Sequence, residues 1–333
     1  MKFIIRWFLF IQLFTTGLSA KDLLSLEKEV EISIVCAGRN DDYGGNFLDR
    51  LEYFLRSVDR FNIPIEIVLV EWNPIPNQPK LSDIIKKWND RLNYKHPIIV
   101  LEVSKDDHLN FCDYYQQANT KYSFQEYPAK NVGIRRSKGK YILQTNPDNF
   151  YPLRTIAVIE RLVLKGFNDI ITAQPVRVDL PVVSSFDSLR NLGNASDLNE
   201  KLEILDNYCR PKTYGSIYAL GDFMLFKRDM AVESRGFFEY PLAIHHFEQT
   251  FVEAFCKSHP SSKLKRLKGI SAFHFDHSRH LGGGLDPLAG ASFIKQSVDK
   301  DLSLGPPVPT PKNDENWGLA RVLIHRNQIN ARL

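Results

Sequence analysis

The chain has 333 residues, of which 43% are hydrophobic and 25% charged, and its formal net charge is +4 at pH 7. This length allows one large domain or two modest ones, and the composition is typical of a globular protein. The weak positive charge gives no reason to expect a nucleic-acid partner, and the sequence shows no heptads and no repeat at a solenoid period, which excludes coiled coils and repeat arrays.

The first 20 residues differ in composition from the rest of the chain. Lys2 and Arg6 precede an apolar run from Trp7 to Leu18, followed by small residues. This layout predicts a secretory signal peptide, and the run is shorter than the ~20 residues of a membrane span. Leu18 is larger than the residue usual at that point of a cleavage site, so an uncleaved signal anchor that tethers the chain to a membrane through residues 3–20 remains an alternative. Both predict export or, in a eukaryote, the lumen of the secretory pathway.

The four cysteines, Cys36, Cys112, Cys209 and Cys256, have no spacing typical of a metal site. Cys36 ends an apolar segment, which predicts a buried thiol. A single disulfide among the other three is compatible with export, but the sequence does not assign its pairing.

From residue 31 onward, segments with the pattern of a buried strand alternate with segments of helical periodicity. In residues 46–61, for example, Phe47, Leu51, Phe54 and Val58 recur on one helix face. This alternation predicts a single doubly wound α/β domain whose mostly parallel central sheet is covered by helices on both faces. The predicted strands are 31–38, 64–74, 96–103, 141–143, 169–173 and 218–226, and the predicted helices are 46–61, 81–88, 129–137, 153–165, 246–256 and 314–326.

The predicted domain covers residues 21–311, and residues 312–333 are expected to form a C-terminal helix and tail. Within the domain, 174–211 is expected to be irregular and 281–311 to be a glycine- and proline-rich loop.

Polar clusters follow three of the predicted strands, at Gly38 to Asp42, at Glu71 to Asn73 and at Thr145 to Asn149. Ligands of open α/β sheets bind outside the carboxyl ends of the strands, so three clusters at one edge predict a shared site. The alternative is that these residues only begin turns, as Asn, Asp and Pro often do.

The sequence lacks both glycine-rich patterns that commonly hold a phosphate at a helix N-terminus. A charged ligand would therefore need basic side chains or a metal ion. Asp148 is a hard, anionic ligand of the kind that Mg²⁺ or Mn²⁺ prefers.

Four stretches, in this order and spacing, resemble the GT-A glycosyltransferases of the large family 2 type: ISIVCAGRNDD, IEIVLVEWNP, YPAKNVGIRRSKGKYILQTNPD and GDFMLFKRDMAVESRGFFE. The third is similar to the family pattern A-[RK]-N-x-G-x-x-x-A-x-G-x-[YF]-I-x-x-x-D-x-D. FHFDHSRH and NDENWGLA are similar to segments of an uncharacterised subgroup. The resemblance extends from residue 31 to about residue 280 and implies a GT-A, Rossmann-like fold.

The resemblance implies that Asp148 binds the metal ion that bridges a nucleotide-sugar diphosphate. Asn146 departs from the family's first aspartate, and we expect it to contact ribose or a metal-bound water. Lys130 corresponds to a basic residue beside the diphosphate. The further residues expected to bind the nucleotide are Arg39, Asp41, Asp42, Glu71 and Asn131.

For catalysis, the resemblance implies a carboxylate base that opens a helix after the acceptor segment, which assigns this role to Glu248, with Asp222 as the second candidate. His274 or His277 is expected to be a further metal ligand, although a histidine in a strand is as often a core residue. The basic run 263–268 is expected to be a solvated face.

The sequence thus predicts a glycosyltransferase that moves a sugar from a nucleotide-sugar, with UDP as the expected nucleotide, to a hydroxyl of a glycan or glycoconjugate. Inversion at the sugar and assistance by Mn²⁺ or Mg²⁺ are part of this prediction. The alternatives are a nucleotidyltransferase, which would need a glycine-rich N-terminal loop that residues 36–46 fit poorly, and a non-catalytic glycan-binding relative.

Overall fold

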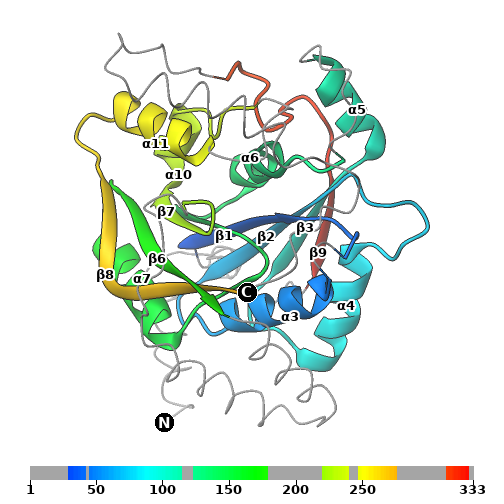
Figure 1. The fold of residues 1–333 in the computed structure, drawn as a ribbon, viewed down its shortest axis with the longest axis horizontal. Helices are drawn as coiled ribbons and strands as arrows, with labels where there is room; N and C mark the ends of the chain where they lie inside the picture. Colours follow the sequence, from blue (N-terminus) through cyan, green and yellow to red (C-terminus); the bar gives the residue numbers. More distant parts are fainter. Residues whose placement is uncertain are drawn as a thin grey trace, which may run out of the picture.

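The computed structural model describes residues 29–42, 45–114, 123–178, 220–239, 247–275 and 313–329. They form one nine-stranded sheet with strand order β5-β8-β6-β7-β4-β1-β2-β3-β9 (Figure 1). The predicted signal segment and His277 lie outside the described residues.

The first half of the chain builds the parallel centre of the sheet. β1 pairs in parallel with β2 on one side and β4 on the other, and β2 pairs in parallel with β3. Every residue of β1 and β2 is buried, which explains their nearly continuous apolar sequences. The elements of this half are β1 (Ile32–Gly38), α3 (Phe47–Val58), β2 (Ile65–Trp72), α4 (Leu81–Leu92), β3 (Ile98–Val103), α5 (Lys105–Tyr114), α6 (Glu126–Arg136) and β4 (Tyr141–Thr145).

The second half extends the sheet on both sides with mixed strand directions. β7 is antiparallel to β4 and to β6, β8 is parallel to β6, and β5 is antiparallel to β8. Consequently β1, β2, β3, β4, β6 and β8 run one way, and β5, β7 and β9 run the other. The elements are β5 (Asn149–Phe150), α7 (Leu153–Lys165), β6 (Ile170–Val178), β7 (Phe223–Lys227), α10 (Arg228–Glu233), α11 (Phe247–Ser258), β8 (Leu264–Phe275) and β9 (His325–Ile329).

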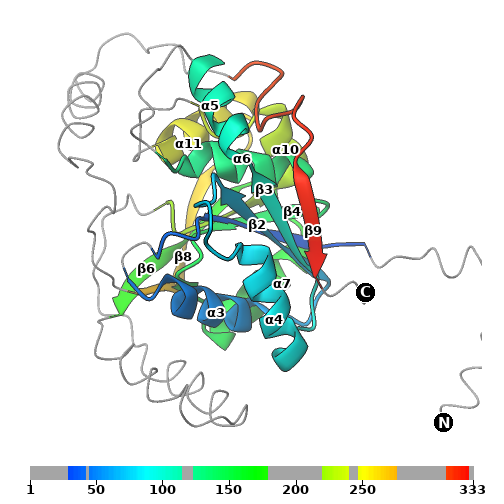
Figure 2. The same cartoon turned by 90° about the vertical axis from the view of Figure 1, so that its right-hand side faces the viewer.

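Helices cover both faces of the sheet, as Figures 1 and 2 show. α3, α4 and α7 bury their apolar sides on one face, and α5, α6, α10 and α11 cover the other. The predicted doubly wound α/β domain with a mostly parallel central sheet is therefore confirmed. Among the described helices, none has both the length and the apolar character needed to cross a membrane.

Helix α6 packs closely against β1 and β2. A Cβ atom at Gly133 would lie 2.6 Å from Cγ1 of Val35, so a larger residue would push the helix away from the sheet. This close contact fixes the position of the side chains at the start of α6, which face the carboxyl ends of the strands.

The predicted helix at 314–326 is wrong. Residues 315–322 form turns, in which Gly318 and Leu319 have φ values of 62° and 51°. β9 then pairs antiparallel with β3 and closes that edge of the sheet. Two consecutive left-handed residues are incompatible with a right-handed helix, and sheet pairing captures the chain beyond them. The C-terminal segment is thus part of the domain.

Candidate functional site

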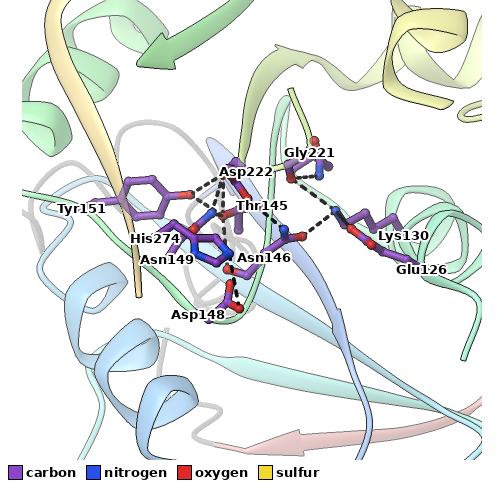
Figure 3. A network of polar contacts seen from close by, with 11 residues as sticks. Glu126, Lys130, Thr145, Asn146, Asp148, Asn149, Tyr151, Gly221, Asp222 and His274 are labelled. Carbon is purple, nitrogen blue, oxygen red and sulfur yellow. Dashed lines mark hydrogen bonds and ion pairs between the residues drawn. The ribbon is translucent and has the colours of Figure 1, made fainter. Parts of the chain in front are cut away.

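A network of polar side chains lies at the carboxyl end of β4, next to the turn that precedes β7 (Figure 3). Asn146, the first residue after β4, is at its centre. Its Oδ1 accepts a hydrogen bond from Lys130 Nζ at 2.7 Å, and its Nδ2 donates to Asp222 Oδ1 at 3.0 Å. We define the charge network as Arg50, Glu126, Lys130, Asn146, Asp148, Asp222 and His274.

Lys130 is fully buried in spite of its charge. Nζ donates hydrogen bonds to Glu126 Oε1 at 2.6 Å, to Asn146 Oδ1 at 2.7 Å and to the carbonyl oxygen of Gly221 at 3.3 Å. Glu126 lies one turn earlier in α6, so the two residues form an ion pair within the helix. Burial of an ammonium group is tolerated only when its donors are satisfied, and the three acceptors meet that condition.

Asp148 is also buried, and an arginine reaches it from α3. Arg50 Nη1 lies 3.2 Å from Asp148 Oδ2, and Arg50 Nη2 donates to the carbonyl oxygen of Gly45 at 3.1 Å. The Arg50 side chain is only 2% exposed. His274 in β8 places Nε2 3.6 Å from the same Asp148 oxygen. The Asp148 carboxylate therefore lies between a guanidinium group and an imidazole ring.

The backbone around Asp222 is held by side chains that follow β4. Its carbonyl oxygen accepts hydrogen bonds from Thr145 Oγ1 at 3.0 Å and from Asn149 Nδ2 at 2.6 Å. The Tyr151 hydroxyl donates to Thr145 Oγ1. These bonds fix the segment before β7 against the end of β4 (Figure 3) and so fix the Asp222 carboxylate beside Asn146.

Glu248 lies in the first turn of α11, close to the backbone of Gly221. A Cβ atom at Gly221 would lie 2.5 Å from Glu248 Oε1, so a larger residue at position 221 would displace the carboxylate. Burial raises the pKa of Glu248, and a hydrogen bond with Tyr127 opposes part of the increase. Burial likewise raises the pKa of Asp222. A higher pKa makes each carboxylate a stronger base than an exposed one.

The loops after β1 (residues 39–42) and after β2 (residues 73–80), which we call the rim loops, are joined by polar side chains. Arg39 Nε donates to the carbonyl oxygen of Asn73 at 2.7 Å, and Nη1 contacts Asp41 Oδ2 at 3.3 Å and Ser123 Oγ at 2.9 Å. The amide of Asn40 also bonds the backbone of the second rim loop. Asp41 Oδ1 is buried and has no hydrogen-bond partner among the described residues.

Two predicted nucleotide ligands instead accept hydrogen bonds from the backbone at the start of a helix. Asp42 Oδ1 accepts from the N–H of Phe47 at 2.9 Å, at the first turn of α3. Both carboxylate oxygens of Glu71 lie within 3.1 Å of the N–H of Leu81, at the first turn of α4. Burial raises the pKa of Glu71 to about 7.

Asn131, the residue after Lys130 in α6, is hydrogen-bonded to the segment 237–239. Nδ2 donates to the carbonyl oxygen of Phe237 at 2.7 Å and to Glu239 Oε1 at 2.8 Å, and Oδ1 accepts from the N–H of Phe237 at 2.8 Å. These bonds occupy the side-chain amide and fix the segment 237–239, so the structure gives Asn131 a scaffolding role.

The structure thus brings together Lys130, Asn146, Asp148, Asp222 and His274, with Glu248 beside Gly221. It places Arg39, Asp41 and Asp42 in the rim loops, and Glu71 beneath the second of them. Sequence reasoning missed Arg50 and Glu126. Arg50 carries a signal, because it lies three residues after Phe47 and four before Phe54, on the apolar face of its helix. Glu126 is also detectable, four residues before Lys130.

In this arrangement the described residues do not fit the divalent metal ion that the resemblance implies. Asp148 has a guanidinium group against its carboxylate, and Asn146 has an ammonium group against its amide oxygen. No group of three His, Cys, Asp or Glu side chains in the described part of the chain is arranged to hold a metal ion.

No protein-family model and no curated protein matches the chain. Among solved structures, S. aureus TarS in complex with UDP-GlcNAc has a TM-score of 0.48 at 11% identity, over 84% of this chain and 68% of that one. The mannosyltransferase PcManGT from Pyrobaculum calidifontis, in complex with GDP-Man and Mn²⁺, has a TM-score of 0.48 at 13% identity. The match covers 91% of this chain and 73% of that one. GalNAc-T7 with UDP, GalNAc and Mn²⁺ has a TM-score of 0.48 at 14% identity. The match covers 82% of this chain and 49% of GalNAc-T7, so this chain spans about half the length of GalNAc-T7. Likenesses at this level do not establish a family, and the fold class follows from the sheet order and the helices on its two faces.

Proposed function

We propose that the protein is a glycosyltransferase that moves a sugar from a nucleotide-sugar to a hydroxyl of a glycan or glycoconjugate. The observation that supports this most is the position of the charge network at the carboxyl end of β4. Ligands of doubly wound sheets bind at this edge. The network also contains the residues of the stretch that resembles the family pattern, namely Lys130, Asn146 and Asp148.

In the proposed reaction, Glu248 accepts the proton of the acceptor hydroxyl. The hydroxyl oxygen then forms a bond to the anomeric carbon, and the bond from that carbon to the diphosphate breaks, with its electron pair going to the phosphate oxygen. A single in-line displacement of this kind inverts the anomeric centre. The raised pKa of Glu248 and its contact with Gly221, next to Asp222 and Asn146, suit this role.

Asp222 is the second candidate for the base, and the structure supplies a reason to rank it lower. Asp222 Oδ1 accepts a hydrogen bond from Asn146, as Glu248 has one with Tyr127, so these contacts do not distinguish the two carboxylates. The backbone of Asp222 is held by Thr145 and Asn149, so Asp222 is better placed to orient the sugar or the acceptor than to move toward it.

We assign the nucleoside to the rim loops. Asp41 has a buried oxygen without a hydrogen-bond partner in the described part of the chain, and a ribose hydroxyl or a base N–H is a suitable donor to it. The expected nucleotide is UDP.

Export through residues 1–20 is also part of the proposal. N-terminal sequencing of the secreted protein tests it: a start near Lys21 indicates cleavage, whereas an intact N-terminus in the cytosolic fraction contradicts export.

The proposal is tested by thermal unfolding of the purified protein with UDP, GDP or CMP, each with EDTA and with Mn²⁺. A ligand that binds only the folded state raises the melting temperature, because it adds RT ln(1 + [L]/Kd) to the free energy of unfolding. We expect the largest increase with UDP. No increase with any nucleotide under either condition would contradict the proposal, and release of pyrophosphate from a nucleoside triphosphate and a sugar phosphate would favour the nucleotidyltransferase instead.

A further inference from the structure

Asn146 and Asp148, the two described residues at the positions of the family's metal-binding motif, each have a cationic side chain of the protein beside them. Resting on the proposed function, we propose that this site binds the nucleoside diphosphate without a divalent metal ion, and that Arg50 and Lys130 supply the positive charge in its place.

The first observation is the ion pair of Arg50 with Asp148. The guanidinium group lies 3.2 Å from the carboxylate oxygen, is almost fully buried, and is held from behind by the carbonyl oxygen of Gly45 at 3.1 Å. Arg50 Cζ also lies 5.9 Å from the centroid of the Phe47 ring, so the guanidinium group packs over that ring. Arg50 is thus a buried residue on the sheet-facing side of α3, unlike an exposed arginine that forms a surface ion pair.

The second observation is that Lys130 contacts Asn146, the residue at the other position of the motif. The family has an aspartate where this chain has Asn146, and the amide oxygen of Asn146 faces the Lys130 ammonium group at 2.7 Å. An amide is a weaker metal ligand than a carboxylate, and this one accepts from a cation. The change from Asp to Asn at position 146 and the buried Lys130 beside it therefore both disfavour a metal ion at this position.

The geometry disfavours adding a metal ion to this arrangement. Mg²⁺ needs oxygen ligands at about 2.1 Å, so an ion on Asp148 Oδ2 would lie within a few ångströms of the guanidinium group. Two like charges at about 4 Å repel each other by several kcal/mol at the effective dielectric constant of a protein surface. Arg50 would have to move away from Asp148 Oδ2 before a metal ion could bind that oxygen.

Side-chain cations can perform the task that the metal performs in the resembling family. The departing diphosphate gains negative charge, and arginine or lysine groups fixed in a site of low polarity stabilise such charge well. A guanidinium group also matches phosphate oxygens geometrically, whereas lysine acts as a compact point charge. The site has one of each, on either side of the turn 146–148.

The experiment compares nucleotide binding with and without metal, by isothermal titration of UDP and GDP into the full chain after removal of metals with EDTA. For the nucleotide that binds, we expect dissociation constants with EDTA and with Mn²⁺ to agree within about threefold. Binding that needs Mn²⁺, or that Mn²⁺ strengthens by about tenfold or more, overturns the inference and leaves the proposed function intact. Failure of both nucleotides to bind under both conditions overturns the proposed function and the inference with it.

Variants of Arg50 sharpen the test. Arg50→Ala should weaken binding in EDTA by about tenfold or more, and Mn²⁺ should restore part of the loss because Asp148 becomes available to it. Arg50→Lys should retain binding in EDTA. The matched control is Arg56→Ala, which removes an arginine of the same helix that pairs with Glu52 away from the site, and it should bind as the wild type does. Equal binding by Arg50→Ala and wild type in EDTA would overturn the role of Arg50. If Arg50→Ala does not fold, the dissociation constants of the wild type with EDTA and with Mn²⁺ still decide whether a metal ion is needed.

Discussion

The rim loops and the charge network lie at the same edge of the sheet, but their polar residues are used differently. In and beneath the rim loops, most side chains bind the backbone: Asn40 bonds the second loop, Asp42 accepts from the first N–H of α3, and Glu71 accepts from the first N–H of α4. The pair of Arg39 with Asp41 is the exception among these residues. In the charge network, side chains bind one another, and a buried lysine and a buried arginine pair with carboxylates.

This difference separates side chains that hold a loop in place from side chains whose charges are buried against one another. Capping satisfies backbone groups that any helix start exposes, and it occurs without a ligand. Burial of two cations and several carboxylates costs free energy that a fold alone has no reason to incur. Polar residues after a strand can therefore have either role, and the partner of each side chain distinguishes them.

The largest expected effect is on transfer. Glu248→Gln should lower the transfer rate by about 10²–10⁴-fold, because glutamine keeps the size of the side chain but cannot accept a proton. Nucleotide binding should remain close to that of the wild type, as measured by thermal unfolding with UDP. Transfer at the wild-type rate would exclude Glu248 as the base and make Asp222 the next candidate.

The next effect is on stability, and it compares one cation from each region. Lys130→Met should lower the free energy of unfolding by about 3 kcal/mol, because Glu126 and Asn146 lose a buried partner. Arg39→Met, in the rim loops, should cost less, about 1–2 kcal/mol, since it loses hydrogen bonds to Asn73 and Ser123 but its ion pair with Asp41 is partly exposed. Urea unfolding measures both. Equal losses would break the distinction between the two regions.

The raised pKa of Glu71 predicts that the stability of the protein depends on pH. Its pKa is about 7 in the folded protein and 4.5 ordinarily, so between these values the folded protein holds a proton that the unfolded chain has lost. The free energy of unfolding should therefore fall as the pH rises from 4.5 to 7, by roughly 2–3 kcal/mol. Glu71→Gln keeps an acceptor for the N–H of Leu81 and should remove this contribution, which makes the variant more stable than wild type at pH 8.

Urea unfolding of Glu71→Gln across pH 4 to 8 provides the measurement, with Glu31→Gln at the surface pair with Lys140 as the control. A parallel curve for Glu71→Gln and wild type would show that burial of Glu71 does not act on stability. If Glu71→Gln is stable but no longer binds nucleotide, the residue is a ligand, as the sequence predicts, in addition to a cap.

Much of the fold could be predicted from the sequence because the parallel strands are buried on both faces, and α3, α4 and α7 each carry a single apolar side. The C-terminal segment could not. Leu319, Val322 and Leu323 have nearly helical spacing, but two left-handed residues break the turn, and Leu323 is 98% exposed. The edge of β3, far away in sequence, decides the conformation of β9.

For the site, the sequence predicted most of the charge network but not how its members pair. The pairing of Asp148 with Arg50 joins residues 98 positions apart, and that of Asn146 with Asp222 joins residues 76 apart. Contacts of this kind depend on the packing of α3 and β7 against β4. Local patterns cannot contain that information, whereas the caps of Asp42 and Glu71 were detectable as helix starts close by in the chain.

The smallest expected effect separates the two roles of Asp42, which caps α3 and has a φ of 50°. Asp42→Ala should cost about 1–2 kcal/mol, because it loses the hydrogen bond to the N–H of Phe47 and because alanine adopts the left-handed region less readily than aspartate does. Asp42→Gly also loses the cap but adopts that φ without strain, so its loss should be only a few tenths of a kcal/mol. Urea unfolding gives both values. Because Asp42→Gly remains well folded, its affinity for UDP then tests the predicted contact with the nucleotide. Unchanged affinity assigns Asp42 to the support of the loop alone, and a loss of about tenfold adds it to Asp41 as a rim-loop residue that binds the nucleoside.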